Sequence, residues 1–200
     1  MKNQAHIEAF EKLGREIERS LNTESDKSPL NIAIQKSYEE NLWFIPEFTK
    51  KAIKNRTSAA VINGMEPENE LIGLADDICT FLGHGCRNIS KVYLPDKTTL
   101  NRLVIALSKY KWMLNHEYYS NNVRYQKARL KALDIPYVDG GPVLFIEEEQ
   151  LNSPVGIVNI QYYDSIKNVE QTLQINAEKI QCIVGSELIN SVNLGSAQKP

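Results

Sequence analysis

The stretch TSAAVINGMEPENELIGLADDICTFLGHGCRNISKVYLP, residues 57–95, decides the fold class. Residues 57–63 are mostly small or β-branched and predict a strand. Apolar residues then recur at helical spacing over 66–82, and two glycines end that helix. The apolar positions of the helix are Leu71, Leu74, Ile78 and Phe81. A short β-rich run, 90–94, follows and is stopped by a proline, so the stretch reads strand, helix, loop, strand.

The same alternation continues toward the C-terminus. We expect helices at 98–114 and 120–133, and strands at 143–146, 155–163 and 180–184. Asp164 is expected to cap a further helix that carries Ile166, Val169 and Leu173. Strands that alternate with helices are typical of an α/β fold, in which helices cover an open sheet.

Toward the N-terminus the pattern is helical throughout. Residues 5–21, 30–40 and 46–54 are each interpreted as a helix, and Pro46 suits a first helical position. The sequence therefore predicts two parts. These are an all-helical segment at 1–54 and an α/β domain at 55–200.

Composition excludes several classes of protein. The chain has 200 residues, with 23 Lys and Arg against 25 Asp and Glu, and no basic stripe that would indicate nucleic-acid binding. No apolar run approaches the length of a membrane span, and the N-terminal pattern is not that of a signal peptide, so we expect a cytoplasmic protein. Three cysteines without a CxxC pair indicate free thiols, not a disulfide framework or a metal site.

The loop after the helix at 66–82 carries the candidate chemistry. Cys86 follows Gly83 and Gly85, which let a substrate approach the thiol closely. Arg87 and Lys91 are cations that favour the reactive thiolate. A backbone N–H left free by the turn is a candidate to face a developing oxyanion. These features make Cys86 a candidate nucleophile.

The cysteines can also be interpreted as structural residues of the core, and this alternative to a catalytic role stays open. A single cysteine is more often a small buried apolar residue than a nucleophile. Cys79 and Cys182 lie within apolar runs and are interpreted as core residues. His84 is a candidate activator of Cys86, although a loop histidine is more often solvated.

The run Gly83-x-Gly85-Cys86-Arg87-Asn88-x-Ser90-Lys91 resembles the nucleophile loop of LuxC-type fatty acyl-CoA reductases, which belong to the aldehyde dehydrogenase superfamily. Further blocks are similar to the same family over almost the whole chain. They are 7–14, 41–46, 55–61, Asp76-Asp77-Ile78, 118–122, 135–139, 153–155, 162–164, 180–185 and 194–200.

The resemblance implies a fold and a reaction. The fold is an aldehyde-dehydrogenase-like catalytic domain, and the reaction is NADPH-dependent reduction of a long-chain fatty acyl-CoA to the aldehyde. Cys86 corresponds to the nucleophile that forms the thioacyl intermediate. Gly85, Arg87, Asn88 and His84 are its expected support. The family also implies a homo-oligomer built through the catalytic-domain sheet, and an association with luminescence.

The sequence departs from the family at the cofactor. The family carries a Rossmann-like nicotinamide domain between its N-terminal helices and the thiol domain, yet here Ile53 leads almost directly into Asn55. No glycine-rich phosphate loop occurs in the sequence, and Gln150 stands where the superfamily has a ribose-binding glutamate. We therefore expect at most acylation or slow thioesterase chemistry from this chain alone.

Two alternatives to an enzyme stay open. The first is a non-catalytic oligomerisation or interaction module, because the strand at 155–163 alternates polar residues in the manner of an exposed sheet edge. The second is an unstable fragment, in which loss of a whole domain leaves apolar surface uncovered near residues 42–62.

Overall fold

The computed structural model describes residues 57–185 and 191–199, together with the isolated helical positions Lys12, Arg15, Ile32 and Lys36. The chain divides into two units, Met1–Lys50 and Lys51–Pro200, and everything below concerns the second. The predicted helical segment 1–54 lies outside the described residues except at those four positions. No helix in the described ranges is long and apolar enough to cross a membrane.

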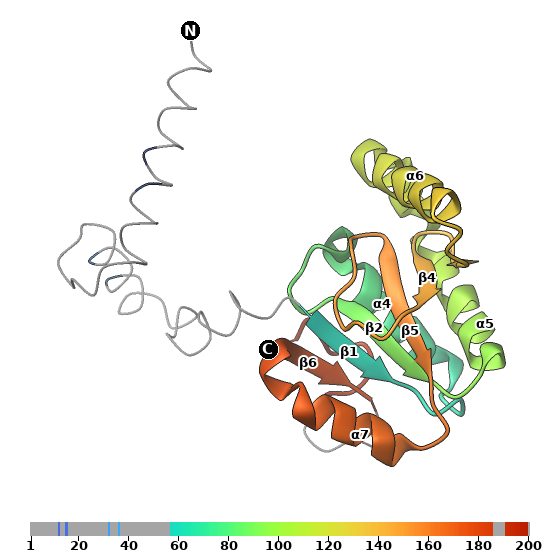
Figure 1. Ribbon diagram of the computed structural model, residues 1–200, viewed down its shortest axis with the longest axis vertical. Coiled ribbons are helices and arrows are strands. Elements are labelled where there is room, and N and C mark those ends of the chain that lie inside the picture. The colour runs from blue at the N-terminus through green and yellow to red at the C-terminus, as the bar shows by residue number, and fades with distance from the viewer. Residues whose placement is uncertain are drawn as a thin grey trace, which may run out of the picture. The chain divides into compact units, whose positions relative to one another are not determined.

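The centre of the domain is a six-stranded sheet in the order β3-β4-β5-β2-β1-β6 (Figure 1). All neighbouring strands run parallel except β3, which pairs antiparallel with β4 at one edge. The strands are β1 (Thr57–Val61), β2 (Ile89–Leu94), β3 (Val138–Asp139), β4 (Leu144–Glu147), β5 (Ile157–Tyr162) and β6 (Ile180–Val184). The α/β class expected from the alternation is confirmed, with a mixed sheet.

Helices cover both faces of this sheet (Figure 1). On one face lie α4 (Glu68–Cys79), α5 (Lys97–Ala106) and α6 (Glu117–Ala132), joined by a 3-10 stretch, Leu107–Asn115. On the other face α7 (Ile166–Ile175) packs Val169 and Leu173 against β1 and β2. Each face has its own apolar core, and the core under α4 and α5 is the larger.

Local sequence explains the helix boundaries on the larger face. Pro95 cannot continue a ladder of hydrogen bonds, and Asp96 then caps α5 by accepting a bond from the Thr99 amide at 2.7 Å. The predicted helix at 98–114 is a shorter α-helix that tightens into 3-10 turns after Ala106. Asp164 is not the helix cap expected; Ser165 occupies the N-cap position of α7 and makes no side-chain cap bond.

The expectation that the strand at 155–163 is a sheet edge is wrong. β5 lies between β4 and β2 and is paired on both sides. Its polar residues alternate because one face of the strand meets polar loop backbone, not because the strand borders solvent. Asn159, for example, is only 2% exposed and donates to two loop carbonyls.

The uncovered apolar surface expected near residues 42–62 is absent from the part of that range that the structure describes. β1 is an inner strand, paired with β2 and β6, and each of its residues is buried. Ile62, which follows it, has no exposed surface. Residues 42–56 lie outside the described residues, so this finding concerns only 57–62.

Candidate functional site

Cys86 lies at the tip of a tight turn between α4 and β2. The turn spans residues 85–88 and is closed by the amide of Asn88, which donates to the carbonyl of Gly85 at 3.0 Å. The amide of Gly85 donates in return to Oδ1 of Asn88 at 2.7 Å. Cys86 is exposed, whereas Cys79 and Cys182 are buried, as the sequence predicted for two core residues.

The side chain of Asn88 caps the C-terminus of α4. Its amide nitrogen donates to the carbonyls of Asp77, Ile78 and Thr80 at 2.9, 3.1 and 2.9 Å. The last carbonyls of a helix have no partner within the helix, so a buried donor there satisfies groups that would otherwise be unpaired. Asn88 is 6% exposed and therefore joins the helix end to the thiol turn.

The backbone between α4 and the turn is left-handed over three residues. Phe81 and Leu82 have φ of 55° and 56°, and Gly83 has φ of 72°. Only glycine adopts this region without cost, while other residues lose roughly 1 kcal/mol each. The chain thus reverses sharply after α4, and the glycine-bounded turn does not continue along the direction of the helix.

Alanine usually gives a more stable protein than glycine, but the left-handed backbone of Phe81 reverses this order at position 81. Phe81 is 70% exposed, so its substitution removes little packing. We expect Phe81→Gly to have a free energy of unfolding about 1 kcal/mol higher than Phe81→Ala, because alanine keeps the left-handed cost. Urea denaturation of both variants measures this difference. A more stable Phe81→Ala would show that the residue does not adopt φ of 55° in solution.

Arg87 does not serve Cys86 in the way expected. Its Nε donates to the carbonyl of Ala197, and its Nη2 lies 3.5 Å from Sγ of Cys182. The guanidinium is therefore directed toward β6 and the C-terminal segment, away from the thiol next to it in sequence. Burial raises the pKa of Cys182, and the charge of Arg87 opposes that rise.

Lys91 is also placed away from Cys86. It lies on β2 with no exposed surface and donates through Nζ to the carbonyl of Glu148. Burial lowers its pKa from the ordinary 10.5 to about 8, while Glu148 and Glu149 act in the opposite direction. The expected role of Lys91 in favouring a Cys86 thiolate has no contact to support it.

His84 and the turn amides complete the predicted set. His84 is exposed, and its amide donates to the carbonyl of Phe81 at 3.1 Å. Within the described ranges, no hydrogen bond joins its imidazole to Cys86. Among the same residues no hydrogen-bond acceptor is found for the backbone amides of Cys86 and Arg87.

The C-terminal segment is anchored beside the turn by Asp77, which belongs to a block of the family resemblance but was not among the predicted site residues. Asp77 of α4 is 1% exposed and accepts from the amides of Gly195 and Ala197 at 2.7 and 2.9 Å. Burial raises the pKa of its carboxyl, and the two amide bonds oppose that rise. The sequence signal that could have identified Asp77 was an acidic residue on the apolar face of a predicted helix.

Gly73 and Gly195 make this anchoring possible. A Cβ on Gly73 would lie 3.0 Å from Cα of Gly195, and one on Gly195 would lie 2.9 Å from Cα of Gly73. Both distances are shorter than side-chain carbons tolerate, so α4 and the C-terminal turn meet backbone to backbone. The result is a connected support: Asp77 holds Ala197, and the carbonyl of Ala197 accepts from Arg87.

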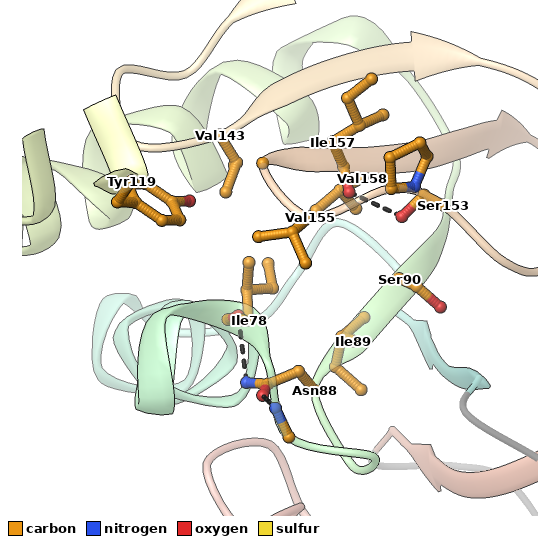
Figure 2. Close-up of a pocket in the computed structure, with 14 residues that line it drawn as sticks. Ile78, Asn88, Ile89, Ser90, Tyr119, Val143, Ser153, Val155, Ile157 and Val158 are labelled. Carbon is orange, nitrogen blue, oxygen red and sulfur yellow. Dashed lines mark hydrogen bonds between the residues drawn. The ribbon is translucent and has the colours of Figure 1, made fainter. Parts of the chain in front are cut away.

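A small cavity of about 60 Å³ lies behind the turn (Figure 2). Gly83, Gly85 and Asn88 form one wall, and the chain at 153–158 forms another. Figure 2 shows the apolar side chains of Ile78 and Val155 converging there. Polar and apolar groups both line the cavity, which does not include Cys86. The cavity thus lies next to the thiol turn without enclosing the sulfur.

The turn between β1 and α4 does not offer a site for the phosphates of a dinucleotide. A dinucleotide phosphate needs free amides in the turn between a strand and the following helix. After β1 those amides are occupied, because the carboxylate of Glu66 accepts from Asn63 and Gly64 at 2.5 and 2.9 Å. The described ranges also hold no group of three or more His, Cys, Asp or Glu placed to bind a metal ion.

No protein-family model matches this chain, and no curated protein matches it at a significant level.

Proposed function

We propose that this chain is the thiol-bearing part of a LuxC-type acyl-CoA reductase with an aldehyde-dehydrogenase-like fold, and that Cys86 accepts the acyl group of a fatty acyl-CoA. The single observation that carries this proposal is the exposure of Cys86 at the tip of a turn braced by Asn88. A thiol presented in this way is open to an acyl carbon, unlike the two buried thiols.

Several blocks on which the family resemblance rests contact one another in the fold. Asp77 of the helix block accepts from the amide of Ala197 in the C-terminal block, and Asn88 of the thiol block donates to the carbonyl of Asp77. These contacts hold the thiol turn, α4 and the C-terminal segment together. They are a property of the fold, and the family assignment remains our proposal.

The acylation step follows from the turn. The thiolate of Cys86 attacks the carbonyl carbon of the acyl thioester, and the resulting oxyanion lies within reach of the free amides of Cys86 and Arg87. Collapse of this intermediate breaks the bond to coenzyme A and leaves the acyl group on Cys86. The proton lost from the Cys86 thiol is then available to the departing CoA thiolate.

Reduction of the thioacyl group is the second half of the family's reaction. NADPH supplies the hydride in that family, and the amides after β1 that could receive its phosphates already donate to the carboxylate of Glu66. We therefore assign this chain the acyl-transfer half, with slow hydrolysis as its own means of turnover. The alternative of a non-catalytic interaction module was based on an exposed strand at 155–163. That basis no longer holds, because β5 is an internal strand.

Labelling with a fatty acyl-CoA tests the proposal. We expect incubation with radiolabelled myristoyl-CoA to give one acyl adduct per chain, located on Cys86 by peptide mass spectrometry. Cys86→Ala should reduce labelling at least 100-fold, because the other thiols are buried. Cys182→Ala is the matched control and should label as wild type does. Absence of an adduct, or equal labelling of Cys86→Ala, would overturn the assignment.

A further inference from the structure

The connection between β4 and β5 is held onto the sheet by side chains from two strands. We call residues 148–152 the strap. Lys91 Nζ donates to the carbonyl of Glu148, and Ser90 Oγ donates to that of Leu151 at 3.0 Å. Nδ2 of Asn159 donates to the carbonyls of Gln150 and Asn152 at 2.8 and 3.0 Å. Four of the five strap carbonyls therefore end on side chains of β2 and β5.

The side chains that hold the strap are polar, yet they occupy buried positions of the sheet where apolar residues are usual. Lys91 and Asn159 are directly paired neighbours on β2 and β5 and are 0% and 2% exposed. Such burial costs free energy that apolar residues would avoid. Oδ1 of Asn159 and the hydroxyl of Tyr93 also lack partners among the described residues. These buried polar groups therefore contribute little to stability. What they do share is that Lys91 and Asn159 both hold the strap in position.

The strap leads directly into the wall of the cavity beside the thiol turn. Ser153, Pro154 and Val155 follow it and line that cavity opposite Gly83 and Gly85. Ser153 closes the end of the strap by donating to the carbonyl of Ile157 at 2.6 Å, a bond that Figure 2 shows. On the other side, Ser90 lies on the strand that leaves the thiol turn, so the same strand borders both the strap and the turn.

We propose that Ser90, Lys91 and Asn159 are positioning residues that clamp the strap and thereby set the wall opposite the Cys86 turn. The clamp is a property of the fold, and its effect on acyl transfer rests on the proposed function. Without the clamp the strap leaves the sheet, and the wall at 153–155 loses its fixed place beside the thiol turn, where the acyl chain of a thioester bound at Cys86 would pass.

A glutamyl-specific protease measures the clamp directly, because the strap and its approach contain Glu147, Glu148 and Glu149. We expect Asn159→Leu and Lys91→Met to increase cleavage at these sites at least tenfold in the full chain, relative to cleavage at Glu117 and Glu170 on α6 and α7. Ser90→Ala removes one hydrogen bond to the strap, together with a weaker one to the carbonyl of Ser58, and should increase the ratio about threefold. This variant decides the test if the stronger variants do not fold.

The matched control is Leu103→Ala. Leu103 lies on α5 with no exposed surface, in the core on the other face of the sheet, and makes no hydrogen bond to the strap. Its truncation lowers global stability, and cleavage at all sites should then rise together. A strap-to-helix cleavage ratio in the clamp variants equal to that of Leu103→Ala, or to that of wild type, would overturn the clamp.

A second measurement separates the clamp from the proposed function. We expect Ser90→Ala to slow acylation of Cys86 by myristoyl-CoA about fivefold while alkylation by iodoacetamide, which has no chain to confine, stays within twofold of wild type. Equal changes in both rates would overturn the link between strap and acyl chain. If wild type is alkylated but never acylated, the proposed function fails, and the cleavage ratios alone decide the clamp.

Discussion

Replacing Asn88 with alanine is expected to lower the free energy of unfolding by about 3 kcal/mol, a large fraction of the stability of a small domain. The side chain donates to three helix-end carbonyls and accepts from the amide of Gly85. Alanine leaves these buried groups without partners, and each such group carries a desolvation penalty. Urea denaturation followed by circular dichroism measures the change.

Two further variants show whether the capping bonds are responsible. Asn88→Asp keeps the acceptor for Gly85 but loses the donor and places a negative charge at the negative end of α4, so it should be at least as unstable as Asn88→Ala. Asn121→Ala, at an exposed position on α6, should change stability by less than about 0.5 kcal/mol. An Asn88→Asp variant as stable as wild type would contradict the capping role.

The stability of wild type relative to Lys91→Met is expected to rise with pH by about 2 kcal/mol between pH 7 and 9.5. Burial lowers the pKa of Lys91 from 10.5 to about 8 in the folded chain. Between these two values the unfolded chain binds a proton at Lys91 that the folded chain has released. The free energy of unfolding therefore increases as pH rises through this window, and below pH 8 the folded state bears the full cost of a buried ammonium.

Denaturation of both proteins across this pH range tests the linkage. Methionine has a similar length and no charge, so subtraction removes the titration of other groups. Measurements stop at pH 9.5 because the buried phenols of Tyr93 and Tyr119, whose pKa values burial raises, begin to matter above that pH. A stability difference that is flat from pH 7 to 9.5 would show that Lys91 is solvated.

Comparison of particular elements shows where sequence reasoning was sufficient. The strand at 180–184 matches β6, and the strand–helix–strand pattern of 57–95 matches β1, α4 and β2. These elements are set by local periodicity and by glycine and proline at their ends. The burial of Cys79 and Cys182 and the exposure of Cys86 followed in the same way, from apolar neighbours in two cases and flanking glycines in the third.

The predictions from sequence were wrong where a side chain contacts an element other than its own. Arg87 and Lys91 are close to Cys86 in the chain, yet one reaches Cys182 and the other reaches the strap. The alternation in β5 was interpreted as a solvent edge because polar residues facing buried loop backbone and polar residues facing water give the same pattern. Strand order is not a local property, so the central place of β5 was not accessible from its own residues.

By itself, the sequence determined the α/β class and a thiol in a glycine-bounded loop, because spacing and turn residues act over a few neighbours. Only the tertiary structure decided that Asn88 caps α4, that Asp77 holds the C-terminal segment, and that Lys91 is buried under the strap. Each of these depends on a hydrogen bond between residues distant in the chain. Burial strengthens such bonds and makes their absence costly, and burial follows from packing.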